Sequence, residues 1–258
     1  MLRKAFTLIE LLVVISVISL LMALLMPALS RARQQGKGVF CLNNLRQMVI
    51  AANLYVADND GYYPLACFMD FDDLSRTYEW DYFKTFENGQ LKEIRPGSLW
   101  SGHTNLQVQQ CPCYDGSANS PGDPYTGYNY NASYIGGFIM KVMGTLQGNN
   151  SIKAVTVNGA SECAIFGDGE FELGANKYMR SPQAGELDET FGDTYRYAGT
   201  QGYQHCGATN VAYCDGSARA VSDIYTNTAS KERIREYNKT HKVKIGFISK
   251  DNSAYDLK

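Results

Sequence analysis

The N-terminal part of the chain contains a long run of apolar residues that is almost free of charge. Residues 6–29 read FTLIELLVVISVISLLMALLMPAL and contain one charged side chain, Glu10. A helix needs roughly 20 apolar residues to cross the hydrocarbon core of a bilayer. The apolar core of a secretory signal peptide is about 7–15 residues long and is followed by a small-residue cleavage site. The pattern therefore predicts a membrane-spanning helix rather than a conventional signal peptide.

Beyond residue 29 the apolar residues recur with a helical period. Val39, Leu42, Leu45, Met48 and Ala52 follow one another at steps of three or four residues. This spacing predicts an amphipathic helix whose apolar stripe faces a core. We expect one continuous, bent helix to about residue 58, where Asn-Asp-Gly favours a turn.

Three residues are expected to weaken this helix. Pro27 lacks a backbone N–H and predicts a kink near residues 23–27. Gly36 and Gly38 each cost about 1 kcal/mol relative to Ala in a helix interior. The segment around them is therefore expected to melt locally. It either allows the helix to stretch when subunits pack in a filament, or the two glycines are simply tolerated on an exposed face.

The remaining sequence shows short, mostly strand-like patterns. We expect strands at 106–110, 128–134, 162–166, 210–214, 217–221 and 243–248, a short helix near 72–82, a helix at 230–239 and a long loop at 171–194. Asp215-Gly216 between two alternating runs is a strong hairpin signal. The expected fold class is α+β, with the long bent helix packed on a small antiparallel β-sheet head that carries long loops.

The length and charge of the chain limit its class. Its 258 residues suffice for one sizeable head and an anchor. The formal charge is −2, and removal of Arg3 and Lys4 would leave 22 basic against 26 acidic residues, or −4. We expect no nucleic-acid partner, since such proteins carry a basic surface.

The first ten residues carry a more specific signal. Met1–Ala5 is a short basic leader, and Phe6-Thr7-Leu8-Ile9-Glu10 follows it. This arrangement resembles the class III signal of type IV prepilins and type II secretion pseudopilins, although that family usually has Gly where this chain has Ala5. The resemblance implies that a membrane prepilin peptidase cuts between Ala5 and Phe6 and methylates the new amine. It also implies that Glu10 meets the amine of a neighbouring subunit, with Phe6, Thr7, Glu10 and Pro27 as assembly residues.

This resemblance divides the chain into a leader and three further parts. The parts are residues 1–5 as leader, 6–29 as the transmembrane half of the helix, 30–60 as its amphipathic half and 61–258 as an extracytoplasmic head. The expected location is the bacterial inner membrane, crossed once, with a cytoplasmic N-terminus. The head would be periplasmic, or exposed at the surface after assembly with other pilin-like subunits.

The C-terminal half carries a second resemblance. His205, nine further residues and then Asp215-Gly216 are similar to the H-X9-DG motif of prepilin-type processing-associated proteins. Within the head itself, we expect a hydrogen bond between His205 and Asp215 that clamps two strands, and no catalysis. The expected function is a structural filament subunit, and the alternative is a membrane-anchored binding protein that uses the same signal.

Seven cysteines accompany this export signal, and an oxidising compartment favours disulfides. The disulfide candidates are Cys41, Cys111, Cys113, Cys206 and Cys214. We favour Cys41 paired with Cys111 or Cys113, which would tie the helix to the head.

No metal site or cofactor is expected from the sequence. Zinc ligand types occur near 111–113 and 205–214, but without a C-x2–4-C pair, so disulfides are preferred to zinc. Calcium is the remaining alternative, with loop oxygen donors at Asp168, Glu170, Asp188, Asp193 and Asp215.

Overall fold

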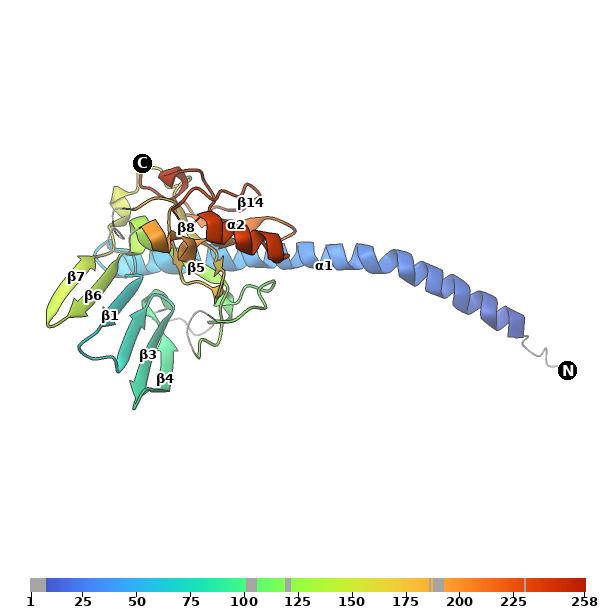
Figure 1. Cartoon of the computed structure of the whole chain (residues 1–258), viewed down its shortest axis with the longest axis horizontal. Coiled ribbons are helices and arrows are strands. Elements are labelled where there is room, and N and C mark those ends of the chain that lie inside the picture. The colour runs from blue at the N-terminus through green and yellow to red at the C-terminus, as the bar shows by residue number, and fades with distance from the viewer. Residues whose placement is uncertain (1–7, 101–105, 119–121, 186, 188–192, 230) are drawn as a thin grey trace.

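The structure is a computed structural model that describes residues 8–100, 106–118, 122–185, 187, 193–229 and 231–258. A single helix, α1 (Leu8–Asp58), projects from a head that is rich in β-strands (Figure 1). The helix runs through Pro27, Gly36 and Gly38 without interruption and curves gently along its N-terminal half. The predicted long bent helix is confirmed, and no break in α1 is seen at the two glycines.

The C-terminal half of α1 lies against a five-stranded sheet inside the head. The strand order is β11 (Tyr178–Met179), β5 (Tyr128–Asn131), β8 (Ala164–Asp168), β13 (Thr209–Tyr213) and β14 (Ala218–Val221). β11 pairs with β5 in parallel, and the other neighbours are antiparallel. The predicted hairpin at Asp215-Gly216 is confirmed, because β13 and β14 flank it.

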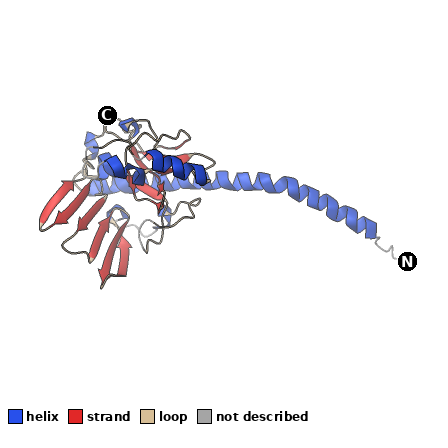
Figure 2. Ribbon diagram, viewed as in Figure 1, coloured by secondary structure: helices blue, strands red, loops and turns tan. Residues whose placement is uncertain are grey.

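Both faces of this sheet are covered by buried side chains, and α1 runs through the head beside it (Figures 1 and 2). Ala212 points to the α1 side, while its neighbours Val211 and Tyr213 join the cluster on the opposite side. This alternation follows from the two-residue period of a strand. Helix α2 (Lys231–Thr240) contributes Ile234 to the opposite cluster and confirms the helix predicted there.

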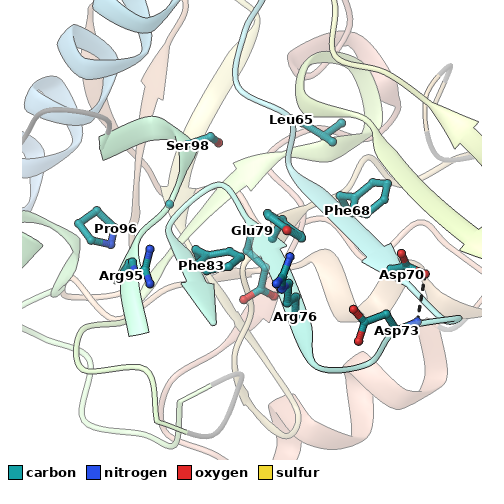
Figure 3. A pocket seen from close by; sticks show the side chains of 12 residues that line it. Leu65, Phe68, Asp70, Asp73, Arg76, Glu79, Phe83, Arg95, Pro96 and Ser98 are labelled. Atoms are coloured by element: carbon teal, nitrogen blue, oxygen red, sulfur yellow. Dashed lines mark hydrogen bonds between the residues drawn. The ribbon is translucent and has the colours of Figure 1, made fainter. Parts of the chain in front are cut away.

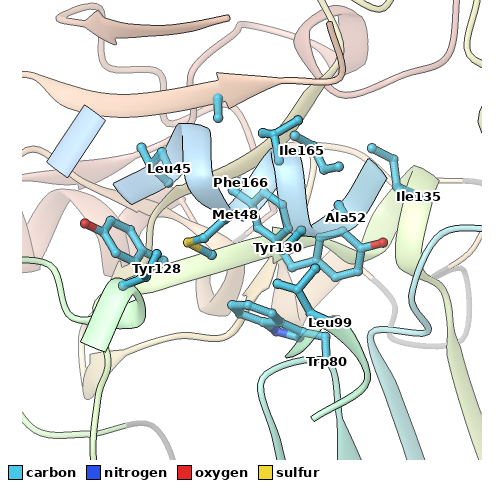
Figure 4. Close-up of a cluster of buried hydrophobic side chains, with 14 of the residues drawn as sticks. Leu45, Met48, Ala52, Trp80, Leu99, Tyr128, Tyr130, Ile135, Ile165 and Phe166 are labelled. Carbon is cyan, nitrogen blue, oxygen red and sulfur yellow. The ribbon is translucent and has the colours of Figure 1, made fainter. Parts of the chain in front are cut away.

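The core on the α1 side is aromatic (Figure 4). Leu45, Met48 and Ala52 of α1 are fully buried. They meet Tyr130 and Phe166, whose rings stack 5.1 Å apart, and Trp80 lies on the same cluster. Of the predicted stripe, only Val39 is exposed, at 68%. Cys41 and Asn44, which were not part of that stripe, are buried as well.

A second, six-stranded sheet extends away from the helix. Its order is β4 (Gln90–Pro96), β3 (Tyr82–Glu87), β2 (Arg76–Glu79), β1 (Cys67–Asp70), β6 (Phe138–Val142) and β7 (Thr145–Asn149). β1 and β6 are parallel, and the other neighbours are antiparallel. The short helix expected near residues 72–82 is wrong, because β2 and β3 occupy that segment.

Shorter elements complete the described chain. They are β9 (Glu170–Phe171) with β10 (Gly174–Ala175), β12 (Gln201–Gly202) with β15 (Ile245–Gly246), a π-helix at Ala132–Gly136, and 3-10 turns at Ser98–Trp100, Leu106–Gln109, Ala154–Thr156, Asp193–Gly199 and Asn252–Ala254. The strand predicted at 106–110 is wrong, since a 3-10 turn stands there. The strand predicted at 128–134 ends at Asn131, whose side chain accepts a hydrogen bond from Tyr134 N and caps the π-helix. The α+β class is confirmed.

Candidate assembly helix and head cluster

The N-terminal half of α1 exposes its apolar side chains. Every residue from Leu8 to Lys37 is exposed, including Leu8 at 82% and Leu24 at 69%. Burying one such side chain is worth about 1.5–3 kcal/mol, so this surface is unfavourable in water. The helix is long and apolar enough to cross a membrane.

The backbone and hydroxyl groups in the N-terminal half of α1 form hydrogen bonds within the helix, as an apolar environment requires. Ser16 and Ser19 donate their hydroxyls to the carbonyls of Val13 and Ile15, each at 2.8 Å, so these polar groups are satisfied within the helix. Glu10 is the one charged residue in the first three turns. The expected cleavage residues Ala5 and Phe6, and Thr7, lie outside the described residues.

The helix enters the head at Gly38. Asn210 Nδ2 donates to the Gly38 carbonyl at 3.3 Å, and Arg46 donates to the Ala218 carbonyl at 3.4 Å. A Cβ added at Gly38 would lie 3.6 Å from His205 Nδ1. A methyl group at Gly38 would therefore make an ordinary van der Waals contact with His205, so the head lies within contact distance of α1 at this level.

Four potential ligand side chains meet beside this junction. Cys41 comes from α1, Cys111 follows the 3-10 turn at 106–109, Asp168 ends β8, and His205 precedes β13. All four are buried, and their ligand atoms all lie within 4.8 Å of one another. No other group of three or more His, Cys, Asp and Glu side chains comes together in this way in the described part of the chain.

The contacts within this head cluster are short. Cys41 Sγ donates to Asp168 Oδ1 at 3.1 Å, and His205 Nε2 lies 3.2 Å from Asp168 Oδ2. Cys111 Sγ lies 3.6 Å from His205 Nε2. Two residues outside the cluster also hydrogen-bond to it. Asn210 N donates to Asp168 Oδ2 at 2.6 Å, and Gln204 Nε2 donates to Cys111 Sγ at 3.1 Å.

Burial and hydrogen bonds shift the proton affinities of these groups in different directions. Burial, together with the hydrogen bond to Cys111, raises the pKa of Cys41 well above its usual value. Burial also raises the pKa of Cys111, but hydrogen bonds with Cys41 and His205 outweigh it and the net pKa is lowered. Burial lowers the pKa of His205, whereas its contacts with Asp168 and Cys111 raise it to about 11. Cys111 is thus the thiol of the cluster that ionises most readily.

The hydrogen bond expected between His205 and Asp215 is not the contact that the structure contains. Asp215 instead accepts from Ser217 N at 2.8 Å and closes the β13–β14 turn, where Gly216 has φ +88°. His205 stands at the base of a turn through Cys206 and Gly207, both with positive φ. Strand β13 fills most of the nine-residue spacer, so the two ends of the motif lie at opposite ends of one strand.

The remaining cysteines lie elsewhere in the head. All seven cysteines fall in the described part of the chain, and all have free thiols. Cys113 is half-buried and Cys206 is exposed, 3.5 Å from Gln34 Oε1. Cys214 lies beside Cys163, which the sequence reasoning did not single out; the hydrogen bond from Cys214, together with burial, raises the pKa of Cys163. The disulfide between Cys41 and Cys111 or Cys113 stays a prediction.

The oxygen donors considered for calcium have separate uses in the structure. Asp168 belongs to the head cluster, Asp215 closes its turn, and Glu170 accepts from the Tyr237 hydroxyl at 3.1 Å. Asp188 and the side chain of Asp193 lie outside the described residues. Asp168 was expected in a loop, whereas it is the last residue of the buried strand β8.

A groove lies on the second sheet, away from the helix (Figure 3). It has a volume of about 780 Å³ and is lined by Phe68, Tyr78 and Phe83 together with charged side chains that include Arg76 and Asp73. Phe68 and Tyr78 meet edge to face at 5.7 Å, and Tyr78 and Phe83 lie 4.7 Å apart. The sequence reasoning did not identify this groove, because its strands were not predicted.

Comparison with known proteins identifies a sequence motif at the N-terminus. Residues 1–26 match the family model of the prokaryotic N-terminal methylation motif. The chain matches no curated protein and no solved structure. The motif and the long apolar helix that follows it make the N-terminal region type IV pilin-like, which confirms the resemblance drawn from residues 1–10. They also fit a substrate of prepilin peptidase anchored in the inner membrane.

Proposed function

We propose that this chain is a structural subunit of a pilin-like or pseudopilin-like filament. The observation that carries the proposal is the exposed apolar half of α1, which directly follows a prepilin-type methylation motif. Such a surface leaves water either in a bilayer or in a bundle of like helices. A subunit of this kind uses the bilayer before assembly and the helix bundle afterwards.

The proposed route begins in the inner membrane, with the N-terminus in the cytoplasm and the head on the far side. Prepilin peptidase cuts between Ala5 and Phe6 and methylates the Phe6 amine. In the filament, that amine and the Glu10 carboxylate of a neighbour pair within an apolar surrounding. Each charge stranded alone there would cost several kcal/mol, so the pair favours one stagger between neighbouring helices.

The test of this route is the intact mass of the full-length protein, expressed with and without a prepilin peptidase. We expect loss of Met1–Ala5 and the addition of one methyl group when the peptidase is present. Ala5→Gly is the matched variant, which should be cut at least as completely, while Ala5→Trp should remain uncut. An unchanged mass beside a control substrate that is cut would contradict the proposed processing.

The second candidate is an anchored protein that binds glycans through its head. The groove on β1–β4 supports it, because Phe68, Tyr78 and Phe83 offer flat apolar faces beside Arg76 and Asp73 as hydrogen-bonding groups. Sugar rings have apolar faces that can stack on such aromatic rings, and hydroxyls that can hydrogen-bond to such charged side chains. Under this alternative, Tyr78→Ala would abolish binding to a glycan array while Glu10→Val would leave it unchanged. Under the filament proposal, Glu10→Val would abolish assembly while Tyr78→Ala would not.

A further inference from the structure

The ligand atoms of the head cluster are spaced like the corners of a metal coordination tetrahedron. Zinc–ligand distances of about 2.0–2.3 Å imply that the ligand atoms of a tetrahedral site lie roughly 3.3–3.8 Å apart. Two separations in the cluster are 3.2 Å, from His205 Nε2 to Asp168 Oδ2, and 3.6 Å, from Cys111 Sγ to His205 Nε2. Cys41 Sγ lies 3.1 Å from the other carboxylate oxygen, Asp168 Oδ1, and one ligand atom from each of the four residues lies within 4.8 Å of the others. A small contraction or expansion around a central ion would complete the geometry.

The donor set selects the kind of metal. Two sulfurs, one imidazole nitrogen and one carboxylate oxygen match the ligands that zinc takes in proteins. Calcium requires six to eight oxygen ligands, which this cluster does not offer. We propose that Cys41, Cys111, Asp168 and His205 bind one Zn²⁺ ion in a closed, structural site that fastens α1 to the head.

The surroundings of the cluster support a structural role. The four residues are 0%, 0%, 0% and 8% exposed, so the protein supplies the whole coordination shell. Catalytic zinc sites, by contrast, keep one position for water or substrate. Gln204 donates to the Cys111 sulfur and Asn210 N to Asp168, as outer groups that orient metal ligands commonly do.

The chain positions of the ligands explain what the ion would do. Cys41 and Asp168 are 127 residues apart, and Cys111 and His205 are 94 residues apart. One ion would therefore close several long loops at once and fix the end of β8 and the turn before β13 to the helix. It also gives His205, the first residue of the H-X9-DG motif, a role independent of filament assembly. Because two thiolates bind the ion, the inference departs from the disulfide expected for Cys41.

The test is metal analysis of the full-length protein purified in detergent without chelator or reductant. We expect one zinc per chain by mass spectrometry of the metal, and loss of that zinc in Cys111→Ser and His205→Ala. Cys113→Ser and Cys206→Ser are matched controls, because each lies beside a ligand yet outside the cluster, and both should keep the zinc. Chelation should lower the melting temperature of the wild type and leave that of Cys111→Ser unchanged.

A second measurement covers variants that fail to fold. Wild-type protein in which Co²⁺ replaces the zinc should show the visible absorption of a tetrahedral site together with sulfur-to-cobalt charge-transfer bands. A chain that takes up neither zinc nor cobalt would overturn the proposal. So would a Cys41–Cys111 disulfide found by peptide mapping under non-reducing conditions, since it would remove both thiolates. Zinc retained by a folded Cys111→Ser variant would overturn it equally.

Discussion

Five charged side chains are packed together inside the head, and their proton balance shows how single residues set its stability. Lys177 Nζ lies 2.8 Å from Glu79 and Asp81 and 2.9 Å from Asp123, and Lys84 joins the same group. Three acids thus face two lysines in a buried place. Burial raises the pKa of Glu79, but Lys177 and Lys84 outweigh it and the net pKa is lowered. Burial raises the pKa of Asp81 to about 6, against the attraction of Lys177.

This shift predicts that Asp81 weakens the fold as the pH rises. The unfolded chain loses the Asp81 proton near its usual pKa of 3.8, while the folded chain keeps it to about 6. The unfolded state therefore binds fewer protons between these values, and stability falls from about pH 4 to 6. Relative to Asp81→Asn, the wild type should lose about 3 kcal/mol of unfolding free energy across that window. Urea denaturation of both proteins between pH 4 and 7.5 measures this difference.

Asp73→Asn is the matched control for that experiment. Asp73 is exposed, and its hydrogen bonds with Ser75 lower its pKa. Asp73 therefore contributes a small stabilisation of the fold that is present above its usual pKa and is lost as the pH falls. This pH dependence is opposite to that expected for Asp81. Parallel pH profiles for the wild type and Asp81→Asn would contradict the role given to Asp81.

At the scale of elements, the docking of α1 depends on a few fully buried side chains. Leu45 is 0% exposed and lies in the cluster that contains both tryptophans of the chain, Trp80 and Trp100. Leu45→Ala should destabilise the head by about 2–5 kcal/mol, because it removes apolar contacts and leaves a cavity. Tryptophan fluorescence during urea denaturation of the protein in detergent reports this loss. Leu54→Ala, at a half-exposed position of the same helix, should change stability by well under half as much.

The β3–β4 hairpin makes a second prediction at this scale. Its turn residues Asn88 and Gly89 have φ +52° and +74°, the backbone that a tight two-residue hairpin requires. Gly89→Ala should destabilise the protein by about 1 kcal/mol, since a Cβ is strained there. Gly36→Ala, in exposed α1, should instead stabilise the protein by a similar amount. Equal effects of the two substitutions on the urea midpoint would contradict this reading of the turn.

The elements that sequence predicted are those with a local signal. The apolar run is recognised by its length, the Asp215-Gly216 hairpin by its turn residues and α2 by its short local pattern, and each is confirmed. The β3–β4 hairpin has an equally local turn signal, Asn88-Gly89, but this hairpin was not predicted from the sequence. The helix expected near residues 72–82 is wrong because β2 and β3 pair there as strands, and Glu79 and Asp81 meet Lys177, about 100 positions further along the chain.

The head cluster could not be assembled from spacing alone. Its ligands come from α1, a loop, β8 and a turn, so their approach depends on tertiary packing and not on a short motif. Cys41, which was expected to tie the helix to the head by a disulfide, lies at the junction of helix and head. Its contact with Asp168 depends on β8 lying beneath α1, which no local pattern shows.

At the scale of the whole molecule, the two ends have different chemistry. The exposed apolar half of α1 lies at one end, and the five- and six-stranded sheets lie towards the other (Figure 1). The groove is lined mainly by residues of the six-stranded sheet. A bundle of such helices would bury the apolar halves and leave the heads outside. The head–helix contacts begin close to Gly38, so about the first thirty residues of α1 are available for neighbours.

The charge at Glu10 gives the last prediction, because it would be the one acidic side chain in the apolar part of the bundle. Glu10→Val should leave membrane insertion and processing intact, since the substitution makes the helix more apolar and lies outside the bond that is cut. It should prevent assembly, because the Phe6 amine of the neighbour would stay buried without a counter-charge. Removing one partner of a buried ion pair costs about 3–5 kcal/mol, which corresponds to roughly a hundredfold or greater loss of filament.

Quantitative immunoblotting of sheared filaments against the membrane fraction measures this loss. Glu87→Val is the matched control, because it removes the same charge from the exposed end of β3 in the head and should leave the filament yield unchanged. Glu10→Asp should retain part of the yield, since a shorter carboxylate keeps the charge but lengthens the ion pair. Normal filaments from Glu10→Val would mean that the apolar surface of α1 alone sets the stagger of neighbouring subunits.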